Sequence, residues 1–240
     1  MAETTPVNWT VTALNLPDHA ANPIHTDEGA RAKGFPAALV AGVTTYLYLT
    51  HPPAAAWGAE WVGGGGCEVS FSAPVFDKDD LTCAVDRSAD GDLVVSAMVG
   101  GDAKAAMSVW SHHLPRPEQR EGQSLPAVES PLEKWRTYPT RAGDDLGLYG
   151  EHDIVHPAAW PSLANEVMSR HLVEGSWIHL RSHIRHHGLA RPEGVATATS
   201  TLVRSFSTSR GDRAVVDVEI SVDGALVATL EHEAYVRLND

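Results

Sequence analysis

The chain has 240 residues, 43% of them hydrophobic, which is enough to bury one large core or two smaller ones. Its 31 acidic residues outnumber its 18 basic residues and give a formal net charge of -13 at pH 7. Such a surface repels the phosphates of nucleic acids, so we expect no nucleic-acid partner.

The N-terminal stretch MAETTPVNWTVTALNLPDHA contains neither a basic leader nor an apolar run, which argues against a signal peptide. No apolar run anywhere in the chain approaches the ~18 residues that a membrane-spanning helix requires. We therefore expect a cytoplasmic protein without a membrane partner.

Residues 28–50 have a helical pattern that glycines and a proline interrupt. This predicts a short helix, a turn, and then a longer helix that begins near Gly42. Thr26 and Asp27 are the expected N-cap of the short helix. The longer helix is apolar on most sides, so we expect it to be buried.

A run of β-strands follows, with VDRSADGDLVV as a clear hairpin signal. The predicted strands are residues 67–74, 81–87, 93–99 and 105–112. Cys67 and Cys83 lie in the first two and form no CxxC pair. We expect them to be free, partly buried thiols in a reducing compartment.

The helix-then-strands pattern recurs after a segment rich in proline, glutamate and serine at residues 115–130, which we interpret as a linker. Residues 162–187 are expected to be helical. Strands are then expected at residues 194–205, 214–222 and 226–237. Aligning Gly42 with Gly175 places a helix after each glycine, so the chain is predicted to be a duplicated α+β protein with units at residues 1–114 and 131–240.

Two motifs in the first unit resemble one known family. Asn22, Pro23, Ile24 and His25 form an N-P-x-H motif, which Thr26-Asp27, Gly34-Phe35 and Ala41-Gly42 follow; the sequence FSAPV at 71–75 precedes Asp80 and Leu81. Together they are similar to the signature of the MaoC-like (R)-specific enoyl-CoA hydratases. The resemblance covers roughly residues 20–85, and the second half resembles the family only in pattern.

The resemblance implies a double hot-dog fold, with two central helices each wrapped by an antiparallel β-sheet. It also implies an acyl-thioester substrate, carried by coenzyme A or pantetheine, and no separate cofactor or metal. Hydration of an enoyl thioester needs one proton removed, one delivered, and an enolate stabilised between the two steps. By resemblance, His25 is the acid or base and the N–H of Gly42 binds the thioester carbonyl, while Asn22 and Ala41 belong to the substrate site.

The sequence departs from the family where an aspartate should precede the motif, because Ala20 stands there. Asp18 and His19 lie nearby but out of register. Three interpretations remain open: Asp18 reaches the site through a rearranged loop, His25 works without it, or the chain binds thioesters without catalysis.

The most basic stretch of the chain is RSHIRHHGLAR at residues 181–191. Arg181 and Arg185 could bind the phosphates of coenzyme A, although an exposed helix end would look the same. Four histidines at helical spacing could bind a metal ion, but we favour a solvated or ligand-facing stripe; they are His179, His183, His186 and His187.

Two further questions stay open in the sequence. Glu174 is expected at the start of the second central helix, where hot-dog thioesterases often carry an acidic residue, so hydrolysis is a third functional hypothesis. A fused pair of units satisfies the usual pairing within one chain, and either a homodimer or a different partner protein is compatible with it.

Overall fold

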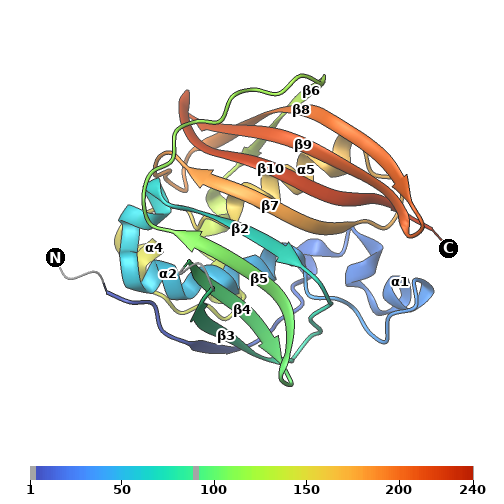
Figure 1. Cartoon of the computed structure of the whole chain (residues 1–240), viewed down its shortest axis with the longest axis horizontal. Coiled ribbons are helices and arrows are strands. Elements are labelled where there is room, and N and C mark those ends of the chain that lie inside the picture. Colours follow the sequence, from blue (N-terminus) through green and yellow to red (C-terminus); the bar gives the residue numbers. More distant parts are fainter. Residues whose placement is uncertain (1–3, 89–91, 240) are drawn as a thin grey trace.

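The computed structural model describes residues 4–88 and 92–239, whose ten strands form a single antiparallel sheet (Figure 1). The strand order is β1-β3-β4-β5-β2-β7-β10-β9-β8-β6, so strands from the first half of the chain occupy one end of the sheet and strands from the second half the other. Within the described part of the chain, none of the helices is long and apolar enough to cross a membrane.

The first half of the chain builds five strands around a long helix. Its elements are β1 (Trp9–Thr12), η1 (Pro17–His19), η2 (Pro23–His25), α1 (Asp27–Ala32), α2 (Gly42–Gly64), β2 (Gly66–Phe71), β3 (Asp80–Arg87), β4 (Leu93–Val99) and β5 (Asp102–Trp110).

The second half repeats this plan with longer strands and a shorter central helix. Its elements are β6 (Gln123–Pro131), η3 (Glu133–Arg136), α3 (Tyr138–Arg141), α4 (Leu148–Glu151), α5 (Ala159–His171), β7 (Ile178–His186), β8 (Val195–Thr208), β9 (Gly211–Val222) and β10 (Ala225–Leu238). Helix α2 packs on the strands of the first half and α5 on those of the second, while β2 pairs with β7 to join the halves.

The predicted start of the long helix is confirmed, because α2 begins at Gly42. Its first three turns are buried on all sides, as the apolar sequence indicates, with Tyr46, Leu47 and Leu49 fully buried. The helix continues past residue 50 to Gly64 and kinks at Gly58, whose φ of 62° is a left-handed conformation that glycine adopts without strain. The short helix α1 is capped by Thr26, whose hydroxyl accepts a hydrogen bond from the Gly29 N–H at 3.2 Å.

The predicted strands of both halves are found within a few residues of their expected ends. Strands β3 and β4 pair antiparallel, from Leu81 opposite Val99 to Arg87 opposite Leu93, as the hairpin signal predicts. The tip of that turn, residues 89–91, lies outside the described residues. Cys67 and Cys83 are free and buried, as expected.

The predicted helix at residues 162–187 is wrong in its second half. Helix α5 ends at His171, and Gly175 has a φ of 80°, which breaks the helical path. Residues 178–186 then form strand β7. Gly175 is therefore not the start of a central helix, and its alignment with Gly42 does not hold.

The predicted linker at residues 115–130 is partly a strand. Residues 123–130 lie in β6, which pairs with β8 at the edge of the sheet. Proline lacks the N–H that a central strand must donate, so its presence concealed an edge strand, where it is tolerated. The strand is irregular between Leu125 and Val128, on either side of one of its prolines.

A buried polar cluster joins helix α2 to the segment before α4. Nδ1 of His51 lies 2.7 Å from Oδ1 of Asp144, which also accepts the Leu146 N–H at 3.0 Å. Nε2 of His156 lies 3.8 Å from the other oxygen of Asp144. Ligand atoms of His51, Asp144 and the exposed Asp145 lie within 4.8 Å of one another. Because Asp144 already accepts two hydrogen bonds, we interpret the cluster as structural, and the expected lack of a metal stays a prediction.

Candidate active site

A cavity of about 800 Å³ lies between the two halves of the chain. The loop that carries the N-P-x-H motif lines one side of it, together with the first residues of α2. The segment after β2, the exposed face of α5 and the start of β7 line the other sides. Both halves of the chain therefore contribute to one site.

His25 lies at the end of η2 and lines this cavity. Its Nδ1 is 2.8 Å from the backbone carbonyl oxygen of Leu39, which can only accept a hydrogen bond, so Nδ1 carries the proton. Burial lowers the pKa of His25, and the hydrogen bond to Leu39 opposes that shift only in part. The ring is therefore neutral at pH 7, with an unprotonated Nε2 that can act as a base.

The first turn of α2 supplies the partial positive charge of the site. Ala41 and Gly42 both line the cavity, and Ala41 precedes the helix with φ -62° and ψ 142°. The first N–H groups of a helix have no acceptor within it, and the alanine side chain cannot cap them. The Gly42 N–H can thus bind a carbonyl oxygen, as the resemblance implies.

Asn22 lines the cavity, but its side chain is engaged in holding the loop. Its Nδ2 donates to the carbonyl oxygen of Trp177 at 3.0 Å, and its Oδ1 accepts the Ile24 N–H at 3.4 Å. The first contact ties the motif to the second half of the chain. We therefore interpret Asn22 as a residue that positions His25.

Asp18 reaches the cavity wall but accepts a hydrogen bond from the Arg141 guanidinium at 2.6 Å. His19, its neighbour, is better placed beside His25. The two imidazole rings meet edge to face with centroids 5.8 Å apart. Nε2 of His19 lies 2.6 Å from the Tyr138 hydroxyl, which lies 2.6 Å from the hydroxyl of Thr44 on α2.

His19 was not assigned a role from the sequence, because it stands one residue out of register with the family aspartate. Burial and, to a smaller extent, the nearby His25 lower the pKa of His19 to about 4. One of two neighbouring neutral imidazoles can take up a proton, and the pair can then deliver that proton elsewhere. A second histidine just ahead of the N-P-x-H motif was the signal that could have identified it.

Comparison with solved structures decides the fold. No protein-family profile and no curated protein matches the chain in sequence. A conserved hypothetical protein of Mycobacterium tuberculosis, described as having a double hotdog fold, matches with a TM-score of 0.68 and 10% identity over 98% of this chain and 96% of that one. The chain has the double hot-dog fold.

Two further structural neighbours are described with different activities. A protein of Chloroflexus aurantiacus described as a MaoC domain dehydratase has a TM-score of 0.60 and 12% identity, with 99% of both chains covered. A protein of Lactobacillus plantarum described as an oleoyl thioesterase has a TM-score of 0.57 and 11% identity, with 98% of both chains covered.

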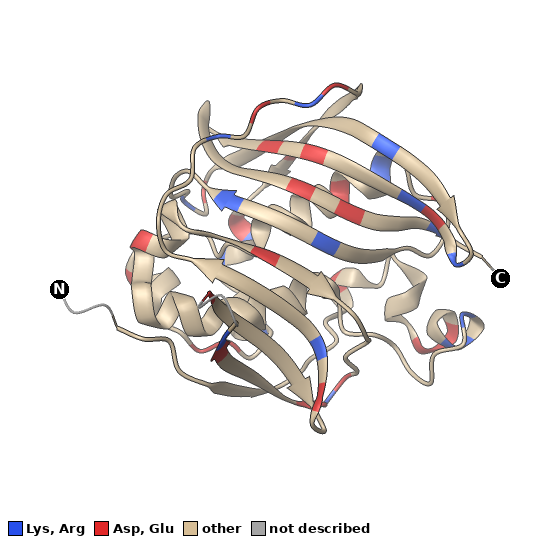
Figure 2. Ribbon diagram, viewed as in Figure 1, with Lys and Arg blue, Asp and Glu red and all other residues tan. Residues whose placement is uncertain are grey.

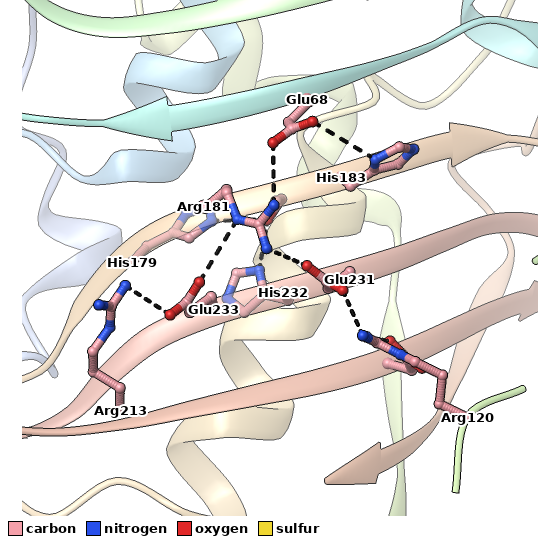
Figure 3. A network of polar contacts seen from close by, with 11 residues as sticks. Glu68, Arg120, His179, Arg181, His183, Arg213, Glu231, His232 and Glu233 are labelled. Atoms are coloured by element: carbon pink, nitrogen blue, oxygen red, sulfur yellow. Dashed lines mark hydrogen bonds and ion pairs between the residues drawn. The ribbon is translucent and has the colours of Figure 1, made fainter. Parts of the chain in front are cut away.

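Arg181 and Arg185 of this double hot-dog lie on the outer face of the sheet and do not line the cavity. Basic and acidic residues are interspersed on the strands of this face (Figure 2), and acidic residues on the neighbouring strands surround Arg181 (Figure 3). Its guanidinium pairs with Glu68 at 3.1 Å, with Glu233 at 3.6 Å, and with Glu231. The structure therefore does not bring the two arginines together with His25, and Arg181 is neutralised by acidic neighbours within the fold, so their assignment to the phosphates of the substrate stays a prediction.

The four histidines at residues 179–187 and Glu174 lie on other elements than the sequence predicts. Strand β7 places Ile184 and His186 on its buried face and His183 on its outer face, so the four histidines do not share one surface. Glu174 is exposed in the turn after α5 rather than on a central helix. The helical spacing that suggested a metal site has no counterpart in the structure.

The predicted carbonyl-binding role of Gly42 can be tested by removing its backbone N–H. Proline is well tolerated at the first position of a helix, and the extended conformation of Ala41 suits the residue before it. For Gly42→Pro we expect kcat to fall by roughly 10²-fold because one donor is lost. Gly42→Ala keeps the N–H, and its Cβ would lie 3.4 Å from Nδ1 of His179, an ordinary contact, so its activity should stay much closer to that of the wild type. Equal activity of the two variants would contradict the role.

The choice between His19 and Asp18 can be tested by matched substitutions. Because His19 lies against His25, His19→Asn is expected to lower kcat by on the order of 10²-fold. Tyr138→Phe removes the hydroxyl that orients His19, and it should lower kcat less while altering the pH profile of kcat. A larger loss for Asp18→Asn than for His19→Asn would assign the second proton transfer to Asp18.

Proposed function

We propose that this double hot-dog protein hydrates enoyl thioesters and dehydrates 3-hydroxyacyl thioesters, with coenzyme A or pantetheine as part of the substrate. The observation that carries the proposal is a neutral His25, with its tautomer fixed by Leu39, in the same cavity as the amino end of a buried helix. The neighbouring folds described as dehydratases are consistent with this chemistry.

In the hydration direction, Nε2 of His25 removes a proton from a water molecule as the water oxygen attacks the β-carbon. The electron pair of the double bond moves to the α-carbon and the carbonyl oxygen, which the Gly42 N–H stabilises. The proton that His25 has taken up then passes to the α-carbon by way of the neighbouring His19, and both rings are neutral again. Dehydration follows the same steps in reverse.

The proposal is tested with crotonyl-CoA and the wild-type protein. We expect the absorbance of the conjugated enoyl thioester to fall with time while no free thiol appears. Binding of crotonyl-CoA without turnover would instead support a non-catalytic thioester-binding protein. Failure to bind it would overturn an acyl-thioester function altogether.

Hydrolysis of the thioester is the second candidate, and it rests on α5. Glu166 lies on this central helix and lines the cavity next to Asn165. Glu166, in the middle of α5, is thus the acidic residue that the second central helix places at the cavity, whereas Glu174 was expected at the start of that helix. The Glu166 carboxylate is ion-paired with Arg170 one turn later. Release of free thiol from a saturated acyl-CoA, abolished in Glu166→Gln, would support hydrolysis over hydration.

A further inference from the structure

A buried chain of three polar side chains crosses from β7 to β10 behind the amino end of α2. Nε2 of His179 lies 2.8 Å from the Ser182 hydroxyl, and that hydroxyl lies 2.8 Å from Nδ1 of His232. The two imidazoles are stacked with centroids 4.2 Å apart (Figure 3). All three side chains are buried, with His179 only 5% exposed.

A β-bulge brings His179 into this chain. Ser182 pairs with His232 and Arg181 with Glu233, but the next paired residue is His179, so Leu180 is an extra residue on β7. Residues three apart on a regular strand point to opposite faces. The bulge instead places His179 and Ser182 on the same buried face, a device often found next to active sites.

His179 has a ring nitrogen without a hydrogen-bond partner beside the cavity. The residue lines the cavity, and its Nδ1, which is buried from solvent, has no hydrogen-bond partner among the described residues. A Cβ placed on Gly42 would lie 3.4 Å from this Nδ1. A polar nitrogen that is buried without a partner is unfavourable, so a ligand atom that pairs with it strengthens binding.

The protons shared by His179, Ser182 and His232 can be arranged in two ways. Burial lowers the pKa of His179 to about 3, and burial also holds the pKa of His232 well below its usual value. Each neutral ring therefore carries one N–H, and the Ser182 hydroxyl must donate to one ring and accept from the other. If Ser182 donates to His179, then Nδ1 of His179 carries a proton that has no acceptor among the described residues. In the other arrangement Nδ1 is bare.

We propose that His179 is a second donor to the thioester carbonyl, supplied by the second unit and acting beside the Gly42 N–H. A bound carbonyl oxygen selects the arrangement in which Nδ1 is protonated. This inference rests on the acyl-thioester ligand of the proposed function, but it does not depend on which reaction follows. It gives the second unit, which lacks an N-P-x-H motif, a direct part in the site.

The test uses two ligands that differ only in the carbonyl group, butyryl-CoA and the thioether S-butyl-CoA. Neither has a double bond to hydrate, and thiol release is monitored during the titrations. His179→Asn keeps an N–H at the position of Nδ1, whereas His179→Gln keeps one only at the position of Nε2, toward Ser182. We expect His179→Gln to weaken butyryl-CoA binding by about tenfold and to leave S-butyl-CoA binding unchanged. His179→Asn should bind both ligands nearly as the wild type does.

Several outcomes would overturn the inference. One is a weaker binding of butyryl-CoA by His179→Asn than by His179→Gln. Another is an equal loss of affinity for butyryl-CoA and S-butyl-CoA. Either result would show a structural role for His179. If the wild type binds butyryl-CoA but does not hydrate crotonyl-CoA, only the hydratase proposal fails. If it binds neither ligand, both proposals fail.

The wild type alone provides a measurement that does not depend on how the variants fold. Nitrogen-15 shifts of the imidazole rings report which nitrogen carries the proton. With butyryl-CoA bound, we expect Nδ1 of His179 to be protonated and Nε2 to be the acceptor from Ser182. A bare Nδ1 in that complex would contradict the assignment.

Discussion

Replacing His25 with alanine is expected to lower kcat for crotonyl-CoA hydration by about 10²–10⁴-fold, because the ring supplies the base that activates water. His25→Asn is the sharper variant. Its amide N–H can still donate to the Leu39 carbonyl oxygen from the position of Nδ1, but it has no base at the position of Nε2. We expect the same loss of kcat in both variants and a smaller loss of thermal stability in His25→Asn.

The pH dependence gives an independent check on His25. Burial lowers its pKa, so the base form is present at pH 7 and is lost only as the pH falls through that lowered value. The acidic limb of kcat/KM for the wild type should therefore lie below pH 6.5, the usual pKa of histidine. Wild-type activity in either His25 variant, or an acidic limb well above that pH, would show that another group is the base.

Asp144→Ala is expected to lower the free energy of unfolding by about 3–5 kcal/mol, because it leaves the buried partners of a charged group without their acceptor. Those partners are the imidazoles of His51 and His156 and the N–H of Leu146. Denaturant unfolding at pH 7 measures the effect. Asp145→Ala is the matched control, since this neighbouring side chain is exposed and should contribute less than about 0.5 kcal/mol.

The stabilisation by Asp144 should depend on pH in a defined direction. Burial acts to raise its pKa, but His156 and His51 outweigh burial and hold the pKa below its usual value. A depressed pKa stabilises the folded state above the unfolded pKa of about 3.9, and the contribution is lost as the pH falls through the folded value. The difference in the free energy of unfolding between the wild type and Asp144→Ala should thus be largest at pH 7 and shrink below about pH 4. A constant gap would mean that the cluster acts by packing alone.

The two largest errors of sequence interpretation have a common origin. In β7 and the residue that follows it, histidines at spacings of four, seven and eight resemble the face of a helix, and the alternation that marks a strand is broken by the bulge at Leu180. In β6, prolines imitate a linker. Each segment forms a strand because neighbouring strands offer it unpaired backbone groups: β2 and β10 pair with β7, and β8 pairs with β6 at the edge. Most of these partner strands are distant in sequence, so the local sequence does not reveal the pairing.

The sequence by itself determined the parts of this protein that are held by short-range contacts: the start of α2 at Gly42, the cap at Thr26 and the hairpins. It also determined the loop of His25, whose fixing acceptor, Leu39, lies only 14 residues along the chain. The tertiary structure decided which side chains meet across the cavity. His19 meets Tyr138 over 119 residues, and Asn22 reaches Trp177 over 155. Such contacts depend on how the two central helices and the strands of the described residues pack together, and no local pattern of residues encodes that arrangement.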